Sequence, residues 1–455
     1  MAKGKGGETV RGRFSIPAGF VVAIFLGAFL LAMPCSNTGG CWMPAMDALF
    51  TSCSAVCITG LTVINPGTDL TVFGQSVLLL LVQVGCVGIM TLGTFVLVVV
   101  GRRISLHEEF TLSDAYGAAG VKGLKGLIIW VVSSLLAIEA IGTVVLRYTL
   151  PEGLLAEGGE WFRAYFYSVM AFCNAGFSRD AGSLMMVAES RPAIFVMGTL
   201  IILGGLGFMA LYNICTIKFW QRSLVQRGRL SLHTRVVLRL TMYLTLAAFV
   251  LFVAVEWVGT LSKMVAGDRL AVAFFHSVTP RTAGFTVVPL ESLHPATRFI
   301  DGVLMFIGAG PGSAGGGIKM TTFFVLICTL SAIYHGRKDV IVHKRTLPID
   351  IIRESIVITF LYAAALAVAT AVLLVSEIGR EGLDFERILF EATSAITTTG
   401  LSIGDTTQRL STFGRCVLMV CMFAGRLGAL TIVLLVAGRE DPQSVRYPKE
   451  EIVVG

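Results

Sequence analysis

A glycine recurs four times along this chain within one short sequence pattern. Each copy has a phenylalanine ten residues before the glycine, then Leu or Phe, then Ser or Thr directly after it. The copies run from Phe50 to Thr62, Phe166 to Ser178, Phe274 to Thr286 and Phe390 to Ser402. Their glycines stand 116, 108 and 116 residues apart. A long fixed period indicates a chain built from copies of one unit.

Glycine-centred turns can line a path for a dehydrated cation. Glycine adopts backbone conformations closed to other residues, so successive carbonyl groups can face one way. Four such turns would form a ring of oxygens that replaces the water shell of a cation. A single glycine in a membrane helix is most often a packing residue, but four copies in register favour the ring. The candidate ligand segments, called the filter segments below, are Ile58, Thr59 and Gly60; Asn174, Ala175 and Gly176; Thr282, Ala283 and Gly284; and Thr398, Thr399 and Gly400.

The filter segments contain no Asp or Glu. The absence of a carboxylate ring argues against a divalent-cation pore and favours a carbonyl-lined site for a monovalent cation. Arg281 directly precedes the third segment and would repel cations if it faced the pore. We expect it to extend away or to pair behind the filter.

Composition indicates a membrane protein. Of the 455 residues, 55% are hydrophobic and 14% are charged, and the mean hydropathy is +0.80. A soluble domain carries about 25% charged residues, so most of this surface suits lipid. The net charge of +7 is interpreted as an orientation bias rather than as a nucleic-acid surface.

The glycine pattern lies inside a larger unit of three segments. Two apolar segments per unit are long enough to cross a bilayer, which takes about 20 residues. The first lie at 16–34, 126–147, 237–258 and 355–376, and the second at 72–100, 193–217, 299–334 and 412–437. Between them, a stretch of about 13–16 residues ends at the repeated glycine and is predicted to enter the membrane and turn back. An acidic residue near each start suits a helix N-terminus: Asp47, Glu160, Asp268 and Asp384.

The sequence therefore predicts an all-α membrane protein of four M1-P-M2 repeats (helix, re-entrant pore helix, helix) around a central pore, with eight transmembrane helices. The repeats are expected at 1–110, 111–228, 229–345 (with a broken second helix) and 346–437, before a cytoplasmic tail at 438–455. With eight crossings, the connecting segments on one side of the membrane hold about 22 of the 36 Lys and Arg residues. That side should be cytoplasmic, and both termini lie on it. Clusters at Arg222, Arg227, Arg229 and Arg235 and at Arg337, Lys338, Lys344 and Arg345 could also bind a partner or lipid head groups.

A second glycine-rich segment interrupts the last helix of the third unit. Residues 308–319 hold too many glycines, together with Pro311, to form a helix. A dinucleotide fingerprint fits literally, but no strand precedes it, and a phosphate loop would need Lys directly after Gly, where Ile318 intervenes. The remaining interpretation is a broken membrane helix whose loop lines the pore below the filter.

Charged residues at membrane depth are candidates for structural or functional pairs. Arg426 lies within the last span of the fourth unit, where an arginine is expected to face the protein interior with a partner, for example in a structural pair with a carboxylate such as Glu139. Glu139 and Glu256 are interpreted as buried hydrogen-bonding groups rather than ion sites. The ten cysteines show no metal spacing, and among them Cys35 and Cys41 fall in an outside loop where a disulfide is allowed.

These motifs, over nearly the whole chain, resemble the potassium transporters of the Ktr/Trk/HKT superfamily, and in particular KtrB-type membrane subunits. The resemblance implies four M1-P-M2 units with one filter glycine each. Relatives with serine in the first unit favour sodium, so Gly60 supports potassium. It also implies that the loop is an intramembrane gate and that Arg426 forms an electrostatic barrier with it. Lys319 would extend this barrier or cap a helix end. The gate residues are then Gly308, Gly310, Gly312, Ser313, Gly315, Gly316, Gly317, Lys319 and Arg426.

The expected function is inward potassium transport across a bacterial inner membrane, with no covalent chemistry and no cofactor in this chain. The resemblance implies a homodimer on a cytosolic KtrA-like nucleotide-binding ring that binds ATP or ADP, with sodium as a further activator. Two alternatives stay open: a Trk- or HKT-like transporter that works with sodium or protons or that selects sodium, and a secondary transporter of an organic solute. Two-fold repeats are the norm for the latter, whereas this chain repeats four times.

Overall fold

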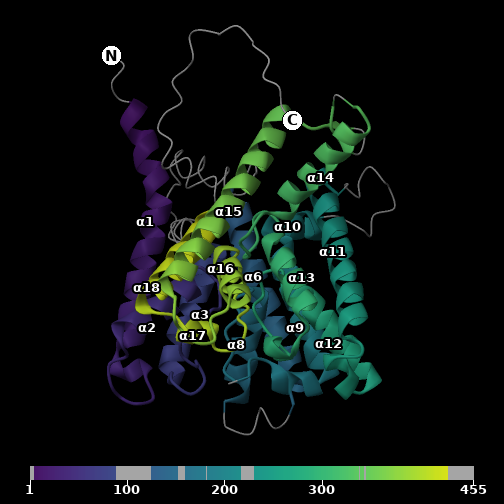
Figure 1. Cartoon of the computed structure of the whole chain (residues 1–455). Helices are drawn as coiled ribbons and strands as arrows, with labels where there is room; N and C mark the ends of the chain where they lie inside the picture. The colour runs from purple at the N-terminus through teal and green to yellow at the C-terminus, as the bar shows by residue number, and fades with distance from the viewer. Residues whose placement is uncertain are drawn as a thin grey trace.

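The computed structural model describes residues 5–88, 124–151, 159–180, 182–216, 230–337, 339–342 and 345–428. Helices make up most of this part of the chain, as Figure 1 shows. Within it, the strands β1 (Ile341–Val342) and β2 (Arg345–Thr346) form one two-stranded antiparallel sheet. The architecture is therefore helical, as the composition predicts, and the predicted tail at 438–455 lies outside the described residues.

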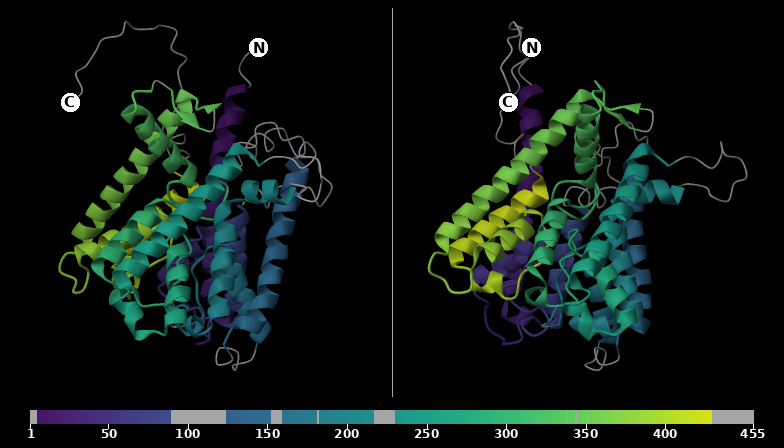
Figure 2. Two further views of the ribbon diagram at one scale, coloured as in Figure 1. Left: turned by 90° about the vertical axis from the view of Figure 1, so that its right-hand side faces the viewer. Right: turned by 45° about the vertical axis from the view of Figure 1, so that its right-hand side comes forward.

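Four long helices occupy the positions of the predicted first segments. They are α1 (Lys5–Ala32), α6 (Leu124–Thr149), α11 (Leu232–Glu256) and α15 (Ile349–Ser376). Three of the described helices have the length and hydropathy to cross a bilayer over an unbroken run: Ile128–Thr149, Leu232–Glu256 and Ile349–Ser376. Figures 1 and 2 show α1 and α15 starting at the same end of the molecule, with α17 (Thr406–Arg409) near the opposite end.

Four short helices follow the long ones and lie largely buried among them. They are α2 (Ala45–Val56), α8 (Glu160–Phe172), α12 (Ala266–Val278) and α16 (Phe385–Ile396). Each contains 12 or 13 residues and has an acidic residue in its first turn. At 1.5 Å per residue, such a helix covers about 20 Å, which is too short to cross a bilayer.

Within the described residues, each second helix ends or is interrupted earlier than predicted. They are α3 (Val72–Val87), α9 (Arg191–Leu206) followed by α10 (Phe208–Thr216), α13 (Pro295–Phe306) followed by α14 (Met320–Tyr334), and α18 (Thr412–Leu427). The single helix predicted for 193–217 is wrong, since α9 and α10 meet at 98°. The remainders of the predicted spans 72–100 and 412–437 lie outside the described residues.

Glycine explains three of these breaks. Gly88, Gly207 and Gly428 follow α3, α9 and α18, with φ of 82°, 88° and 84° and ψ of 136°, 144° and 141°. Side chains clash with the backbone in this conformation, so essentially only glycine adopts it. One backbone geometry thus ends three second helices, and the glycine-rich segment 308–319 interrupts the fourth.

Four short 3-10 helices complete the described connections: η1 (Pro34–Ser36), η2 (Met185–Glu189), η3 (Thr260–Lys263) and η4 (Leu290–Ser292). The disulfide considered for Cys35 and Cys41 is not formed, because both are free thiols. Cys35 belongs to η1, and its carbonyl accepts a 2.7 Å hydrogen bond from Thr71 at the start of α3. Cys41 lies beyond a turn at Gly40, where φ is 62°.

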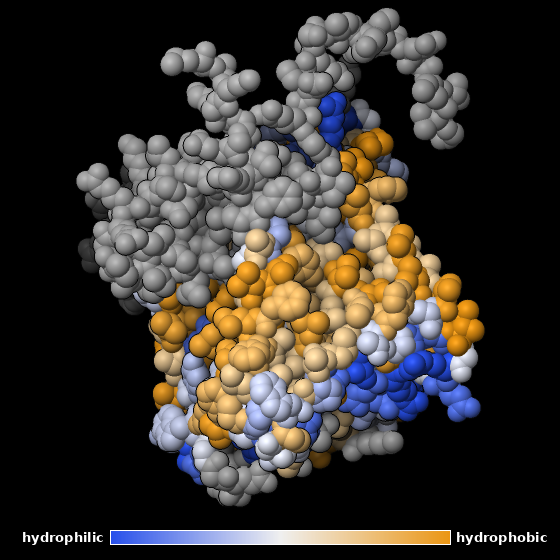
Figure 3. Space-filling model, turned by 90° about the vertical axis from the view of Figure 1, so that its left-hand side faces the viewer, coloured by the Kyte–Doolittle hydropathy of each residue, from blue (hydrophilic) through white to orange (hydrophobic). Residues whose placement is uncertain are grey.

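The outer surface is apolar around the middle of the molecule. Figure 3 shows a belt of hydrophobic residues on one face, with hydrophilic residues gathered below it. On α1, the side chains of Phe25 and Phe29 are 62% and 54% exposed, and Val420 on α18 is 68% exposed. So much exposed apolar surface suits contact with lipid rather than with water.

Ion pairs join successive parts of the bundle at the starts of the short helices. An arginine near the start of one second helix pairs with an acidic residue of the next short helix. The pairs are Arg191–Asp268 at 2.6 Å, Arg298–Glu386 at 2.7 Å and Arg415–Asp47 at 2.8 Å. The last pair links the fourth unit to the first, so the four sets of helices close into a ring. The first and second units meet instead at their filter segments, where a Cβ on Gly60 would lie 2.4 Å from the Ala175 carbonyl oxygen. Arg147 pairs with Glu160 inside the second unit.

Candidate ion-conduction site

The filter segments begin where the short helices end. In the first, second and fourth units, the residue after the helix cap has a left-handed backbone: Ile58 with φ of 55°, Asn174 with 54° and Thr398 with 51°. The next N–H bonds back to the carbonyl five residues earlier, from Thr59 to Ser54 and from Thr399 to Ser394 at 2.8 Å each. This is the Schellman helix ending, which usually places glycine at the left-handed position.

Non-glycine residues in this conformation cost about 1–3 kcal/mol each and persist only where the surroundings fix them. The repetition of the same strained turn in unrelated side-chain contexts indicates a requirement on the backbone path rather than on the side chain. The third unit reaches the same path differently. Its helix ends two residues earlier in the pattern, at Val278, and Thr282 has φ of 74°.

The four repeated glycines face one another around a common centre. All four have positive φ, at 88°, 70°, 75° and 87° for Gly60, Gly176, Gly284 and Gly400. A Cβ added to any of them would meet the carbonyl oxygen that precedes the glycine of the next segment. The oxygens met are those of Ala175, Ala283, Thr399 and Thr59, respectively. The last contact returns to the first segment, so the order around the ring is the order along the chain.

This arrangement brings together all twelve residues of the predicted filter segments. Nearly all of them are completely buried, and three threonine hydroxyls, those of Thr59, Thr282 and Thr398, have no hydrogen-bond partner within the described residues. Backbone carbonyls and hydroxyls are hard oxygen ligands of the kind that replace water around alkali cations. No group of three or more His, Cys, Asp or Glu residues suited to a metal ion occurs in the described ranges.

A second repeated glycine supports the ring from behind, and the sequence reasoning missed it. A Cβ at Gly85, Gly204 or Gly425 would lie 1.9–2.3 Å from the last carbonyl of the adjoining short helix, at Val56, Phe172 or Ile396. Each of these glycines stands three residues before a helix-breaking glycine. The signal was therefore present in the sequence as a recurring Gly-x-x-Gly at 85–88, 204–207 and 425–428.

The glycine-rich segment between α13 and α14 lies directly against the ring. A Cβ on Gly315 would be 2.1 Å from the Thr282 hydroxyl, and one on Gly316 would be 2.4 Å from the Thr398 hydroxyl. Glycine is therefore required for this close approach. The predicted loop residues Gly308, Gly310, Gly312, Ser313 and Gly317 belong to the same segment, of which Ser313 has an unpartnered hydroxyl among the described contacts.

Main-chain hydrogen bonds hold this loop to the break between α9 and α10. Gly310 donates to the Gly205 carbonyl at 2.9 Å, and Phe208 donates to the Gly312 carbonyl at 3.1 Å. A Cβ on Gly207 would lie 2.4 Å from the carbonyl oxygen of Pro311. The unexpected bend in the second unit thus makes room for the loop of the third.

Arg426 and Lys319 also bind this loop through side-chain hydrogen bonds. The Arg426 guanidinium donates to the carbonyls of Ala314 in the loop and Gly85 in α3. The Lys319 ammonium donates to the carbonyl of Gly315. Both cations therefore contact the segment predicted to carry the barrier. The described partners of Glu139 are Gln83 at 2.6 Å and Cys173 at 3.5 Å, so its suggested pairing with Arg426 is wrong.

Two other charged residues take the roles expected from the sequence. The Arg281 guanidinium donates to the Thr245 hydroxyl of α11 at 2.7 Å, outside the filter segments. Glu256 accepts hydrogen bonds from the Thr297 hydroxyl at 2.6 Å and the His294 N–H at 2.8 Å, at the start of α13. It is a buried capping group rather than part of the ring.

Comparison with known proteins identifies the group to which this arrangement belongs. The family described as TrkH, cation transport protein, matches residues 20–447. The chain belongs to the TrkH family of cation transport proteins. Ktr system potassium uptake protein B of Bacillus subtilis is 34% identical over 442 residues, which cover 96% of this chain and 95% of the relative. The potassium/sodium uptake protein NtpJ of Enterococcus hirae is also 34% identical, over 98% of this chain and 99% of that protein.

The fold is also that of a solved TrkH-family structure. The potassium transporter TrkH of Vibrio parahaemolyticus superposes with a TM-score of 0.73, at 19% sequence identity, over 94% of this chain and 85% of that one. The resemblance noted from the sequence is thereby confirmed. Membership of a cation transporter family makes this TrkH-family chain a multi-pass membrane protein and not an enzyme. It also sets aside the transporter of organic solutes.

Proposed function

We propose that this TrkH-family protein takes up potassium through a pore whose narrowest part is the ring of four glycines. The observation that carries the proposal is the cyclic contact of Gly60, Gly176, Gly284 and Gly400, each with positive φ and each against the next segment's carbonyl. The potassium uptake named for the Bacillus relative supports the choice of ion. The carbonyl-lined segments without carboxylates suit a monovalent cation.

The proposed path divides the chain into four M1-P-M2 repeats with eight crossings, at 1–110, 111–228, 229–345 and 346–437, followed by a tail at 438–455. An inside-negative potential would drive entry, because it supplies about 2.3 kcal/mol per unit charge per 100 mV.

The loop 308–319 is proposed as the gate, with Arg426 as a fastening that also repels cations below the ring. The contacts of Gly315 and Gly316 with two filter threonines support an occluded state.

We further propose a homodimer in a bacterial inner membrane with cytoplasmic termini, resting on a cytosolic KtrA-like ring that binds ATP or ADP. The names of Ktr relatives support a system of more than one subunit. Of the basic clusters, Arg235, Arg337 and Arg345 lie among the described residues and stand next to the cytoplasmic ends proposed for α11, α14 and α15. Sodium as an activator remains part of the same proposal.

The test is rubidium influx into proteoliposomes with an imposed inside-negative potential. We expect voltage-dependent influx that excess potassium inhibits and excess sodium does not. Gly284→Ser should retain folded protein and lose this preference. Influx no greater than in protein-free liposomes would refute the proposal. Equal inhibition by sodium would favour the second candidate, a potassium/sodium transporter, which the name of the Enterococcus relative supports.

A further inference from the structure

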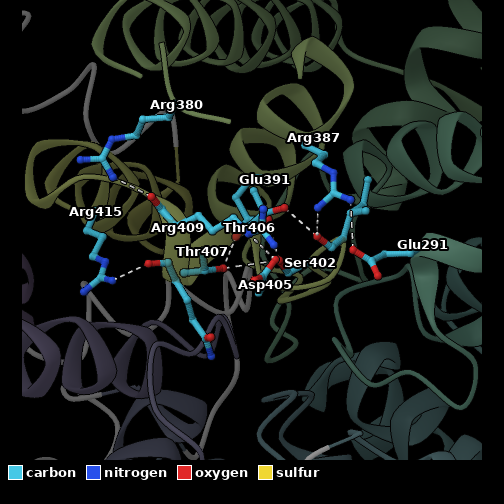
Figure 4. Close-up of polar contacts among 12 residues, drawn as sticks. Glu291, Arg380, Arg387, Glu391, Ser402, Asp405, Thr406, Thr407, Arg409 and Arg415 are labelled. Carbon is cyan, nitrogen blue, oxygen red and sulfur yellow. Dashed lines mark hydrogen bonds and ion pairs between the residues drawn. The ribbon is translucent and has the colours of Figure 1, made fainter. Parts of the chain in front are cut away.

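A buried carboxylate stands behind the fourth filter segment. Glu391 lies on α16, directly after the repeated Phe390, and its residue is 1% exposed. It accepts a 2.9 Å hydrogen bond from the Ser402 hydroxyl and another from the Thr407 hydroxyl of α17. Figure 4 shows Glu391, Ser402 and Thr407 converging within this cluster. Ser402 follows Gly400 by two residues, so the carboxylate fixes the stretch of chain that leaves the ring.

The second unit has a counterpart built from different side chains. Tyr167 occupies the position after the repeated Phe166 and is fully buried. Its hydroxyl lies 3.2 Å from that of Ser178, which follows Gly176 by two residues, and it donates to the Asp180 carboxylate. The Asp180 N–H donates to the Ser178 hydroxyl at 3.1 Å. In the fourth unit a glutamate, and in the second unit a tyrosine, thus bonds to the serine two residues after the repeated glycine. We call this contact the clamp.

The other two units lack this clamp. Thr51 holds the corresponding place in the first unit, and its buried hydroxyl has no partner within the described residues. Phe275 holds it in the third and offers no polar atom. The third segment is instead attached to the second unit, where the Leu184 N–H donates to the Thr286 carbonyl at 2.9 Å. Because ring order follows chain order, the two clamped segments lie diagonally across the ring.

We propose that Glu391 and Tyr167 are positioning residues whose clamps fix the width of the ring along this diagonal and thereby its selectivity among cations. The inference rests on the proposed potassium pore. A ring of carbonyls discriminates between cations only if its oxygens stay at set distances, and the strained turns at Thr398 and Gly400 need outside support to do so. On the side of α16, the Gly400 N–H donates a hydrogen bond to the Ser394 hydroxyl at 3.0 Å. On the side where the chain leaves the ring, Ser402 is held by Glu391.

The exposed pairs around this cluster do not share the role. Arg409 pairs with Asp405 at 2.7 Å, but the two side chains are 47% and 46% exposed. Arg387 pairs with Glu291 at 3.0 Å, and the Glu291 side chain is 51% exposed. Exposed ion pairs contribute little, whereas a buried carboxylate without its donors is costly. The selectivity effect should therefore follow the buried hydrogen bonds and not the charges on the surface of the loop.

The test compares rubidium and sodium influx, in proteoliposomes, for Glu391→Gln, Glu391→Leu and Tyr167→Phe, with Arg409→Ala as the matched control. The amide of Glu391→Gln can still bond both hydroxyls, so we expect its rubidium-to-sodium ratio to stay within about twofold of that of the parent protein. Glu391→Leu removes both bonds and should lower the ratio about tenfold. Tyr167→Phe, which removes a single hydroxyl, should lower it severalfold, and the control should not change it.

The outcomes separate this inference from the proposed function. If the parent protein shows no selective rubidium influx, the proposed function fails. If the parent is selective and Glu391→Leu and Tyr167→Phe reduce total influx at an unchanged ratio, the residues are merely structural and the inference is overturned. A Glu391→Gln ratio as low as that of Glu391→Leu would also overturn it, since charge and not hydrogen bonding would matter. Should Glu391→Leu not fold by size-exclusion chromatography, the ratio of Tyr167→Phe decides.

Discussion

Replacing each ring glycine with alanine should harm transport to different degrees, in an order set by the geometry. An added Cβ at Gly400 would lie 2.0 Å from the Thr59 carbonyl oxygen, whereas at Gly176 the nearest atom would be 3.2 Å away. Gly60 and Gly284 fall between them, at 2.4 Å and 2.5 Å. Ordinary contact begins near 3.4 Å. The neighbouring segment must therefore retreat by about 1.4 Å for Gly400→Ala but only by about 0.2 Å for Gly176→Ala, since interiors are close-packed.

These displacements translate into different losses. Every variant has an alanine in a left-handed backbone, which costs about 1–2 kcal/mol. At 1.4 kcal/mol per factor of ten, this cost alone corresponds to an influx about tenfold lower. A shift above an ångström also removes carbonyl oxygens from the cation. We therefore expect rubidium influx about tenfold below the parent for Gly176→Ala and at least about a hundredfold below it for Gly400→Ala. Gly60→Ala and Gly284→Ala should lie between.

Initial rubidium influx into proteoliposomes, normalised to reconstituted protein, measures this order. Gly302→Ala is the matched control, because Gly302 lies in α13 and an added Cβ meets nothing within 4 Å. It should transport like the parent protein. The reasoning is refuted if Gly176→Ala is impaired as much as Gly400→Ala, or if Gly400→Ala keeps the rubidium-to-sodium preference of the parent.

Three further outcomes are expected. Arg426→Ala removes both carbonyl contacts that fasten the loop, so basal rubidium influx should rise severalfold, and unchanged or lower influx would contradict a fastening role. Gly204→Ala, whose Cβ would lie 1.9 Å from a buried carbonyl oxygen, should destabilise the protein by about 1–3 kcal/mol in thermal unfolding, whereas Gly302→Ala should be neutral or slightly stabilising. A double-mutant cycle on Arg415 and Asp47 should give a coupling free energy of about 0.2–1 kcal/mol. This coupling should decrease at high salt, because both side chains are partly exposed. A coupling that does not depend on salt would exclude a screened ion pair.

Hydropathy and repeats predicted the long helices well. The predicted span 237–258 compares with α11 at Leu232–Glu256, and 355–376 compares with α15 at Ile349–Ser376. The predicted turn-back stretches correspond to α2, α8, α12 and α16. These features follow from apolar length and helix-start residues, which are local. The 98° bend between α9 and α10 was missed. Glycines in an apolar run are also common packing residues, so Gly204, Gly205 and Gly207 taken alone do not fix a change of direction, although the recurring Gly-x-x-Gly marks the place.

In the candidate site, too, some features followed from the sequence and others only from the structure. The repeated pattern predicted that the twelve residues of the filter segments lie together, and the structure places them around one centre. Their role as ligands of a cation stays a prediction. The clamps at Glu391 and Tyr167 were not predictable from that pattern, since the two units use different side chains for the same position. Nor did the sequence indicate that Arg191, Arg298 and Arg415 would each reach an acidic residue of the next unit.

From the sequence alone came the membrane setting, the fourfold repetition, the glycine at the centre of each turn and the break at residues 308–319. Only the tertiary structure decided the cyclic order of the four segments, the closure of the fourth unit onto the first and the fit of the loop beneath two threonines. The physical reason is one of range. Burial and backbone preference are properties of a residue and its near neighbours along the chain, whereas a ring exists only when segments more than a hundred residues apart meet.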